Sequence, residues 1–260
     1  MLCSVSVAWR SATSCGRHVR SGRTPPRGGQ ARSVKFPPRR GSDLRSGRRQ
    51  RRMWEQRLSE MQGRHLAEFR NSPTGRGVIG RAEVAELAAK DPGRALLVAR
   101  SIDHPWYRCQ ALTSVVEADP SAPTAEGLLL EALAVAATQD EPNRVACVAS
   151  WPLRLLVATG STKATEHTLQ LLEVIATEPH GLRRLDGLRG ILVAVASSDP
   201  LRALVLEPLT LAAVASHGWR TERIIDVIAV ILMPFDREAA SRLLSLRPPS
   251  RYTKRSRAML

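Results

Sequence analysis

Apolar positions recur at a helical spacing from residue 53 onward. The first set predicts an amphipathic helix from residue 53 to about Arg70, because its members stand three or four residues apart. They are Trp54, Leu58, Met61, His65 and Phe69. The run from Asn71 to Gly75 contains a proline and a glycine and ends this helix. No alternation of apolar and polar residues follows, so the pattern predicts an all-α protein.

Helix-start signals then recur along the chain. Asp91-Pro92 and Asp199-Pro200 each place an aspartate N-cap before a proline at the first helical position, and Asp236 opens a similar helix. Turns are expected at His104-Pro105, Glu141-Pro142, Pro179-His180-Gly181 and His217-Gly218. We therefore expect first helices near residues 91, 123, 162, 199 and 236, and second helices near residues 105, 142, 181 and 219.

The two series of helices share a period of about 37 residues, which is typical of helical repeats. Helix pairs at this period bury their apolar faces only against neighbouring pairs, so the expected fold is a right-handed α-solenoid of antiparallel helix pairs. The predicted organisation is a disordered basic segment (1–52), an amphipathic helix plus linker (53–79), a repeat domain (80–246) and a basic disordered tail (247–260).

Residues 80–246 resemble the HEAT-like family of helical repeats. Units of that family carry an acidic residue at the inter-helix turn and an arginine early in the second helix, followed by alanine and leucine. Asp103, Arg108, Ala111 and Leu112 match this pattern, and Pro208 stands where a first helix of the family often kinks. The turns near residues 180 and 217 depart from it by carrying histidine and glycine. Tetratricopeptide units have a similar period, but their large aromatic positions cannot be placed in this chain.

The formal net charge of +15 lies at the two ends of the chain. Residues 1–52 contain 14 Lys and Arg and a single acid, Asp43, while residues 247–260 contain five Lys and Arg and no acid. Residues 53–246 contain 20 basic and 23 acidic residues, so the body is nearly neutral. This distribution weakens a charge-based assignment of the whole chain to nucleic-acid binding.

The composition of residues 1–52 predicts disorder, because Gly, Pro, Ser and Arg leave too few apolar side chains to form a core. We expect translation to start downstream, at Met53 or Met61. Cys109 and Cys147, expected among apolar neighbours on helices, are interpreted as reduced thiols, which favours a cytoplasmic protein. An Arg- and Ser-rich segment with few acids also resembles an organellar transit peptide, the alternative location. A twin-arginine export signal is excluded because no apolar stretch follows Arg51-Arg52.

Motifs for catalysis, cofactors and metals are weak. The GxGxxG run from Gly75 to Gly80 lacks the preceding strand that phosphate binding needs, so we interpret it as a linker. His104, His180 and His217 stand at equivalent turns, too far apart to share a zinc ion, and are expected at caps or on the surface. The cysteines lack metal-ligand spacing, and no apolar run approaches the roughly 18 residues of a membrane span. We therefore expect no cofactor, no metal and no membrane segment.

Arginines and aromatics mark the expected second helices. Trp106, Tyr107, Trp151 and Trp219 are expected to pack between repeats, with an aromatic binding rim as the alternative. In solenoids the second helices commonly line the concave face, so their arginines predict a mildly basic surface that binds an acidic partner. The candidate binding residues are Arg108, Arg144, Arg154, Arg184, Arg189, Arg220 and Arg223. An arginine-rich solvated face that reflects codon usage is the competing interpretation.

The function favoured by these observations is a non-catalytic scaffold or adaptor that binds another protein. The oligomeric state stays open. The alternative is a HEAT-like nucleic-acid-binding protein or an enzyme similar to the helical-repeat DNA glycosylases. That resemblance would give roles to Trp106 and Trp219 as aromatic contacts and to Asp226 as the catalytic aspartate. Salt-dependent DNA binding separates the two hypotheses.

Overall fold

The computed structural model describes residues 56, 59–60, 62–247 and 254–259. All regular secondary structure in these residues is helical, which confirms the all-α prediction for this part of the chain. The segment 1–52, residues 248–253 and 260 of the C-terminal tail, and Trp54, Leu58 and Met61 of the first predicted helix lie outside the described residues.

Residues 62–71 are helical, and a bend at Ser72 separates them from the helices that follow. These are, in chain order, α2 (Pro73–Leu87), α3 (Pro92–Ser101), α4 (Pro105–Ala118), α5 (Ala125–Ala136), α6 (Pro142–Ala158), α7 (Lys163–Ala176), α8 (Gly181–Val195), α9 (Asp199–Ala215), α10 (Trp219–Leu232), α11 (Arg237–Ser245) and α12 (Lys254–Arg257).

Helices α3 to α11 begin within two residues of the starts predicted from the sequence. Local caps explain this agreement. Asp91 and Asp236 are N-caps whose side chains accept from the amides of Arg94 and Ala239. Asp199 departs from the prediction, since Ser198 is the N-cap of α9 and the Asp199 carboxylate lies 2.8 Å from the Arg202 guanidinium.

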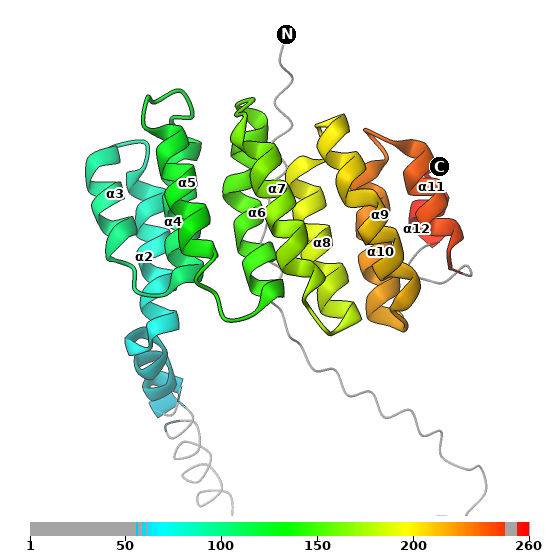
Figure 1. The fold of residues 1–260 in the computed structure, drawn as a ribbon. Coiled ribbons are helices and arrows are strands. Elements are labelled where there is room, and N and C mark those ends of the chain that lie inside the picture. The colour runs from blue at the N-terminus through cyan, green and yellow to red at the C-terminus, as the bar shows by residue number, and fades with distance from the viewer. Residues whose placement is uncertain (1–55, 57–58, 61, 248–253, 260) are drawn as a thin grey trace, which may run out of the picture. The chain divides into compact units, whose positions relative to one another are not determined.

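Successive helices run in opposite directions and form two layers (Figure 1). Helices α2, α4, α6, α8 and α10 form one layer, because each contacts the next. Helix α9 contacts both α7 and α11 in the second layer, and α5 extends it by packing against α4 and α6. Helix α3 packs in the same way against α2 and α4, so the first helix of each pair lies on the layer formed by the second helices.

The core lies between these layers and consists mainly of Ala, Val, Leu and Ile. Helix α8 packs closely against α6 and α7 because a glycine stands where the three helices meet. A Cβ atom on Gly187 would lie 2.5 Å from Ile175 Cδ1 and 3.2 Å from the Ala146 side chain. Only a residue without a side chain fits at this position without moving its neighbours.

The linker prediction for the glycine run is wrong, because residues 73–87 form helix α2. Ser72 caps this helix by accepting from the Gly75 amide, and Pro73 stands in its first turn. Gly75 and Gly77 are buried, and a Cβ on Gly77 would meet the Tyr107 ring at 2.4 Å. The glycines therefore allow α2 to pack against α4 instead of making the chain flexible.

The C-terminal region also departs from the predicted disordered tail where the structure describes it. Lys254–Arg257 form the short helix α12, which contacts α10. The Arg257 guanidinium donates to the carbonyl oxygens of Leu244 and, at 2.6 Å, Arg247. Arg247 in turn donates to the carbonyl oxygens of Ala213 and Ser216. Arginine side chains thus satisfy carbonyls at the ends of helices α9 and α11.

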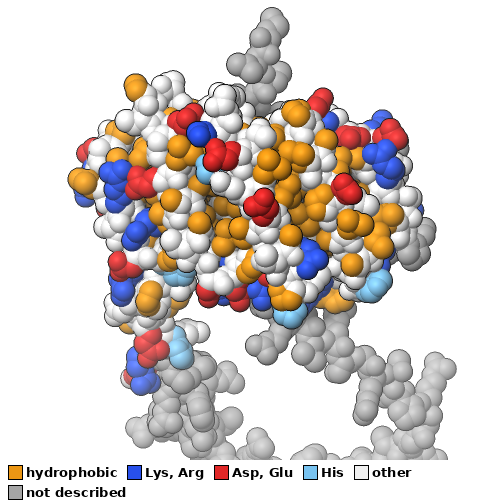
Figure 2. Space-filling model, in the orientation of Figure 1, with side chains coloured by type: hydrophobic (Ala, Val, Ile, Leu, Met, Phe, Trp, Pro, Cys, Tyr) orange, Lys and Arg blue, Asp and Glu red, His pale blue; other side chains and the backbone are white. Residues whose placement is uncertain are grey.

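Large apolar side chains also remain on the surface of the helices. Figure 2 shows hydrophobic side chains over the middle of the face where α7 and α9 lie, with single acidic side chains among them. On α9, Leu211 and Val214 are 64% and 52% exposed. On α10, Val227 and Val230 are exposed as well. Neither set contributes to the core between the layers.

Candidate functional site

A groove of about 440 Å³ opens between helices α6, α8 and α10. Its walls combine basic, apolar and aromatic side chains from these three consecutive members of one layer. The lining residues are Asn143, Leu182, Arg183, Asp186, Arg189, Trp219, Arg220, Arg223, Ile224 and Val227. Four arginines and a single carboxylate give the groove a positive charge.

The α10 wall carries two arginines beside a half-exposed indole. The guanidinium carbons of Arg220 and Arg223 lie 5.4 and 5.8 Å from the centre of the Trp219 ring, which is the distance of a cation–π contact. Neither arginine has an ion-pair partner among the described residues. Trp219 is 51% exposed, so an incoming group can reach both the ring and the guanidinium groups.

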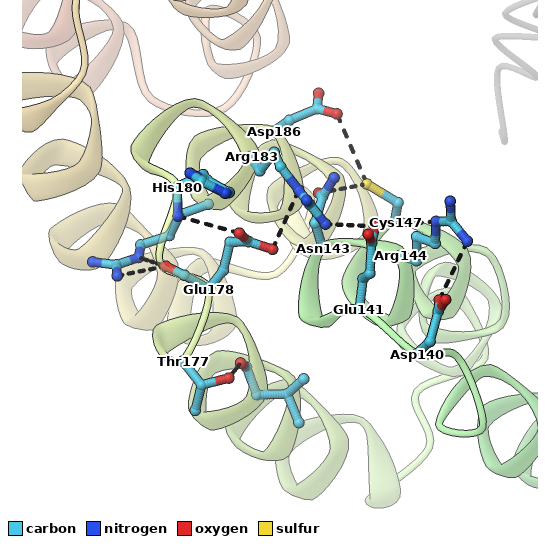
Figure 3. Close-up of polar contacts among 12 residues, drawn as sticks. Asp140, Glu141, Asn143, Arg144, Cys147, Thr177, Glu178, His180, Arg183 and Asp186 are labelled. Carbon is cyan, nitrogen blue, oxygen red and sulfur yellow. Dashed lines mark hydrogen bonds and ion pairs between the residues drawn. The ribbon is translucent and has the colours of Figure 1, made fainter.

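The α8 wall is organised around Asp186. Its carboxylate lies 2.8 Å from the Arg189 guanidinium, one turn further along the same helix. Cys147 of α6 approaches the same carboxylate, with its Sγ 4.0 Å from Asp186 Oδ2 and 3.3 Å from Asn143 Oδ1 (Figure 3). Burial, and then the charge of Asp186, raise the pKa of the Cys147 thiol to about 12. The thiol therefore stays protonated near neutral pH and is a poor nucleophile.

Arg183 connects the groove to the turn between α7 and α8. Its guanidinium lies 2.5 Å from Glu141 and 3.5 Å from Glu178, so it bridges carboxylates from two turns (Figure 3). The Glu178 side chain is only 1% exposed, and its second oxygen accepts from the His180 amide at 3.2 Å. A buried carboxylate needs such partners to offset its lost hydration. The charge of Arg183 is thus largely compensated within the fold.

Backbone polarity adds to the positive character of the groove. The N-caps of α8 and α10 are His180 and Gly218, and neither provides a side-chain hydrogen bond to the first-turn amides. These helix N-termini carry partial positive charge and unsatisfied N–H groups close to Leu182 and Trp219. The groove thus combines two uncapped helix ends with guanidinium groups, an arrangement that attracts anions.

The structure brings together only part of the arginine set predicted from the sequence. Arg189, Arg220 and Arg223 line the groove. Arg154 pairs with Glu117 across the contact between α4 and α6. Arg144 lies 3.2 Å from Asp140 and 3.1 Å from Glu141, so two carboxylates neutralise it.

Arg108 and Arg184 serve the fold itself. Arg108 Nε donates to the Ile102 carbonyl at 2.6 Å, and Arg184 donates to the Glu178 carbonyl at 2.6 and 2.9 Å. In both cases the acceptor stands six residues earlier, at or just after the end of the preceding helix. They satisfy carbonyls that helix geometry leaves without partners. Their early position in the second helices therefore reflects turn capping.

The groove also contains residues that were absent from the predicted set, namely Asn143, Leu182, Arg183, Asp186, Ile224 and Val227. All of these except Val227 stand in the first two turns of consecutive second helices. Aligning the expected second helices by their starts would have revealed this shared position. The binding residues predicted from the sequence were all arginines, so the apolar and carboxylate residues of the groove were missed.

The remaining aromatic and histidine candidates lie elsewhere. Trp106 and Tyr107 of α4 are partly buried against the core. Helices α6 and α8 separate Trp106 on α4 from Trp219 and Asp226 on α10, so these three residues do not share a site. His104 packs on the Tyr107 ring with ring centres 4.9 Å apart. Among the described residues, no group of three or more His, Cys, Asp or Glu could hold a metal ion.

Comparison with family models, with curated proteins and with solved structures finds no match for this chain. In the described part of the chain, no helix combines the length and the apolar character that a membrane crossing requires.

Proposed function

We propose that this protein is a non-catalytic interaction scaffold that binds an acidic segment of another protein in the groove of α6, α8 and α10. The observation that carries the proposal is the pair Arg220 and Arg223, which flank the exposed Trp219 without ion-pair partners among the described residues. Arginine and tryptophan dominate the energetic centres of protein interfaces. Leu182, Ile224 and Val227 add an apolar wall.

An acidic segment with at least one apolar side chain matches this groove. Its carboxylates would receive two parallel hydrogen bonds from a guanidinium, the geometry in which arginine binds carboxylates most strongly. Its apolar side chain would lie on Trp219 and Val227, where burial adds about 25 cal/mol per Å². Arg183 and Arg189 already have carboxylate partners, so we expect them to contribute less than Arg220 and Arg223.

We further propose that the helix pairs form a right-handed α-solenoid of the HEAT-like type with a period of about 37 residues. Three observations support this proposal. Second helices α4, α6, α8 and α10 begin at residues 105, 142, 181 and 219. Each contacts the next in one layer. Arg108 and Arg184 repeat the same capping contact two pairs apart. A cytoplasmic location accompanies this proposal, and fluorescence microscopy of the tagged full chain tests it.

The test of the binding proposal compares two charge-reversed forms of the full chain. One carries Arg220→Glu and Arg223→Glu in the groove. The matched control carries Lys163→Glu and Arg242→Glu, which change the net charge equally on exposed turns of α7 and α11. Fluorescently labelled poly-glutamate serves as the direct probe, and affinity capture with mass spectrometry identifies cellular partners.

We expect the groove variant to bind poly-glutamate at least about tenfold more weakly than the control variant. The basic ends of the chain are the same in both forms, so their contribution cancels. Partners captured by wild type and control, but lost with the groove variant, are those that use the groove. Equal binding by the two variants contradicts the proposed site.

One observation favours the nucleic-acid alternative. An exposed indole between two arginines can stack an unpaired base while the guanidinium groups contact phosphate. The glycosylase-like form of this hypothesis also requires Trp106, Trp219 and Asp226 in one site, and α6 and α8 stand between their helices. Single-stranded DNA in the same binding assay separates the two functions. A salt-dependent loss of DNA binding that is specific to the groove variant would favour the alternative.

A further inference from the structure

Two neighbouring helices carry exposed stripes with the same spacing and opposite charge. The α9 stripe consists of Leu204, Glu207, Leu211 and Val214, and the α10 stripe consists of Arg220, Arg223, Val227 and Val230. All eight residues are exposed. In each stripe the steps are three, four and three residues, which is the spacing of the a and d positions along a coiled-coil seam. Such a seam normally faces another helix.

Neither stripe is covered within the described chain. Leu204 and Leu211 on α9 are 39% and 64% exposed, and Val227 and Val230 on α10 are 43% and 44% exposed. Glu207 has no ion-pair partner among the described residues, and the same holds for Arg223. Exposed leucine and valine beside a charge without an ion-pair partner are typical of a surface that meets another molecule.

We infer that the α9 stripe of one copy docks in parallel on the α10 stripe of a second copy. In this register Glu207 faces Arg223, Leu211 faces Val227, and Val214 faces Val230. The remaining pair places the aliphatic part of Arg220 against Leu204, as long basic side chains often cover apolar neighbours. The antiparallel register would instead place Arg223 against Leu211 and Glu207 against Val227, leaving both charges without a partner.

The contact joins copies head to tail. Helix α9 belongs to the layer of α7 and α11, whereas α10 belongs to the layer of α6 and α8. Because the two stripes lie on different layers, each copy offers one docking surface of each kind, and the interface is heterologous. A contact of two helices is small, so we expect weak association that depends on protein concentration.

Self-association uses the same wall of the groove as the proposed partner site, since Arg220, Arg223 and Val227 belong to both. To that extent the inference rests on the proposed function. An acidic partner and a second copy would therefore compete for α10. Acidic partner segments should dissociate the self-assembled form.

Sedimentation velocity of the full chain tests the inference with two opposite charge reversals. Glu207→Arg makes both facing positions basic, and Arg223→Glu makes both acidic. Each variant alone should associate at least about tenfold more weakly than wild type, because like charges then face each other. An equimolar mixture of the two variants should recover association, because every contact again joins opposite charges. Matched controls are Glu86→Arg on α2 and Arg242→Glu on α11, which should behave as wild type.

Recovery in the mixture supports the α9–α10 contact and also shows that both variants are folded. The inference is overturned if the wild-type protein stays monomeric at all concentrations. It is also overturned if the mixture of the two variants fails to recover association. Poly-glutamate binding is measured separately on the same proteins. If wild type is monomeric but the groove variant still loses poly-glutamate binding, self-association fails and the proposed function stands. If the wild type self-associates but the groove variant binds poly-glutamate as tightly as the control variant, the proposed partner class fails instead.

Discussion

At the scale of single residues, arginine plays two different roles in this protein. Arg108 and Arg184 are half-buried and donate to carbonyl oxygens six residues earlier, at or just after the ends of α3 and α7. Arg220 and Arg223 lie on the surface beside Trp219. All four residues are arginines that lie within the first five residues of a second helix. At the end of α9, the carbonyl oxygens of Ala213 and Ser216 accept from Arg247 instead.

Removing a capping arginine should cost more stability than removing one from a surface pair. Arg184→Ala leaves the backbone carbonyl of the buried residue Glu178 without its two N–H donors. We expect the free energy of unfolding to fall by about 1–3 kcal/mol. Arg154→Ala breaks an exposed pair with Glu117 and should cost less than about 1 kcal/mol. Urea unfolding followed by circular dichroism measures both, and equal losses would contradict the capping role.

The Cys147 thiol predicts a dependence of stability on alkaline pH. Its pKa is about 12 in the folded chain and about 9 when unperturbed, because burial and Asp186 oppose the thiolate. The folded state thus holds this proton more tightly than the unfolded state. The resulting stabilisation is complete below pH 9 and is lost as the pH rises from 9 toward 12. Cys147→Ala removes the titrating group and should show a shallower loss of stability over this range in the same urea titrations.

At the scale of elements, glycine has opposite consequences in different helices. Gly77 in α2 faces the Tyr107 ring at a distance that leaves no room for a Cβ. Gly127 in α5 is exposed, and a Cβ there would meet nothing within 4 Å. Helix propensity alone would favour alanine at both positions. Packing between helices therefore decides which glycine the fold requires.

Two Gly→Ala substitutions should consequently change stability in opposite directions. Gly77→Ala forces Tyr107 to move and should lower the free energy of unfolding by about 1–3 kcal/mol. Gly127→Ala should raise it by up to about 1 kcal/mol, because alanine loses less backbone entropy in a helix. Thermal unfolding of both variants in the same buffer provides the comparison. Stabilisation by Gly77→Ala would show that α2 does not pack on α4 as described.

At the scale of the whole molecule, the layered contacts predict local loss of stability. If each helix pair is stabilised only by its neighbours, as the solenoid proposal states, damage at one end should not spread along the array. A globular core with a single cooperative unit would instead lose protection everywhere at once. Hydrogen exchange measured by mass spectrometry distinguishes these behaviours.

Leu244→Ala at the C-terminal end provides that test. Leu244 is fully buried in α11, so its truncation should cost about 2–5 kcal/mol locally. We expect faster exchange in α10 and α11 while α4 and α5 keep their protection. Leu112→Ala in α4 is the matched change near the other end and should produce the reverse pattern. A uniform increase in exchange with either variant would exclude the solenoid proposal.

The sequence by itself determined the helices and their starts. Proline, aspartate caps and helical periodicity act over a few residues, so Asp91, Pro105 and Pro142 mark helix starts whatever surrounds them. Prediction from local sequence was wrong at Gly75–Gly80, where a glycine-rich run typical of linkers is helical. There Ser72 caps the helix, and contact with Tyr107 on α4 favours small residues.

The tertiary structure alone decided which side chains meet. Asn143, Asp186 and Arg223 stand about 40 residues apart in the chain, yet they line one groove because α6, α8 and α10 pack in a row. Packing also decided that Arg184 reaches a carbonyl while Arg220 remains on the surface. A helical pattern in the sequence specifies which residues share a face of one helix. It does not specify which face of the next helix lies opposite, because that depends on close packing between residues distant in the chain.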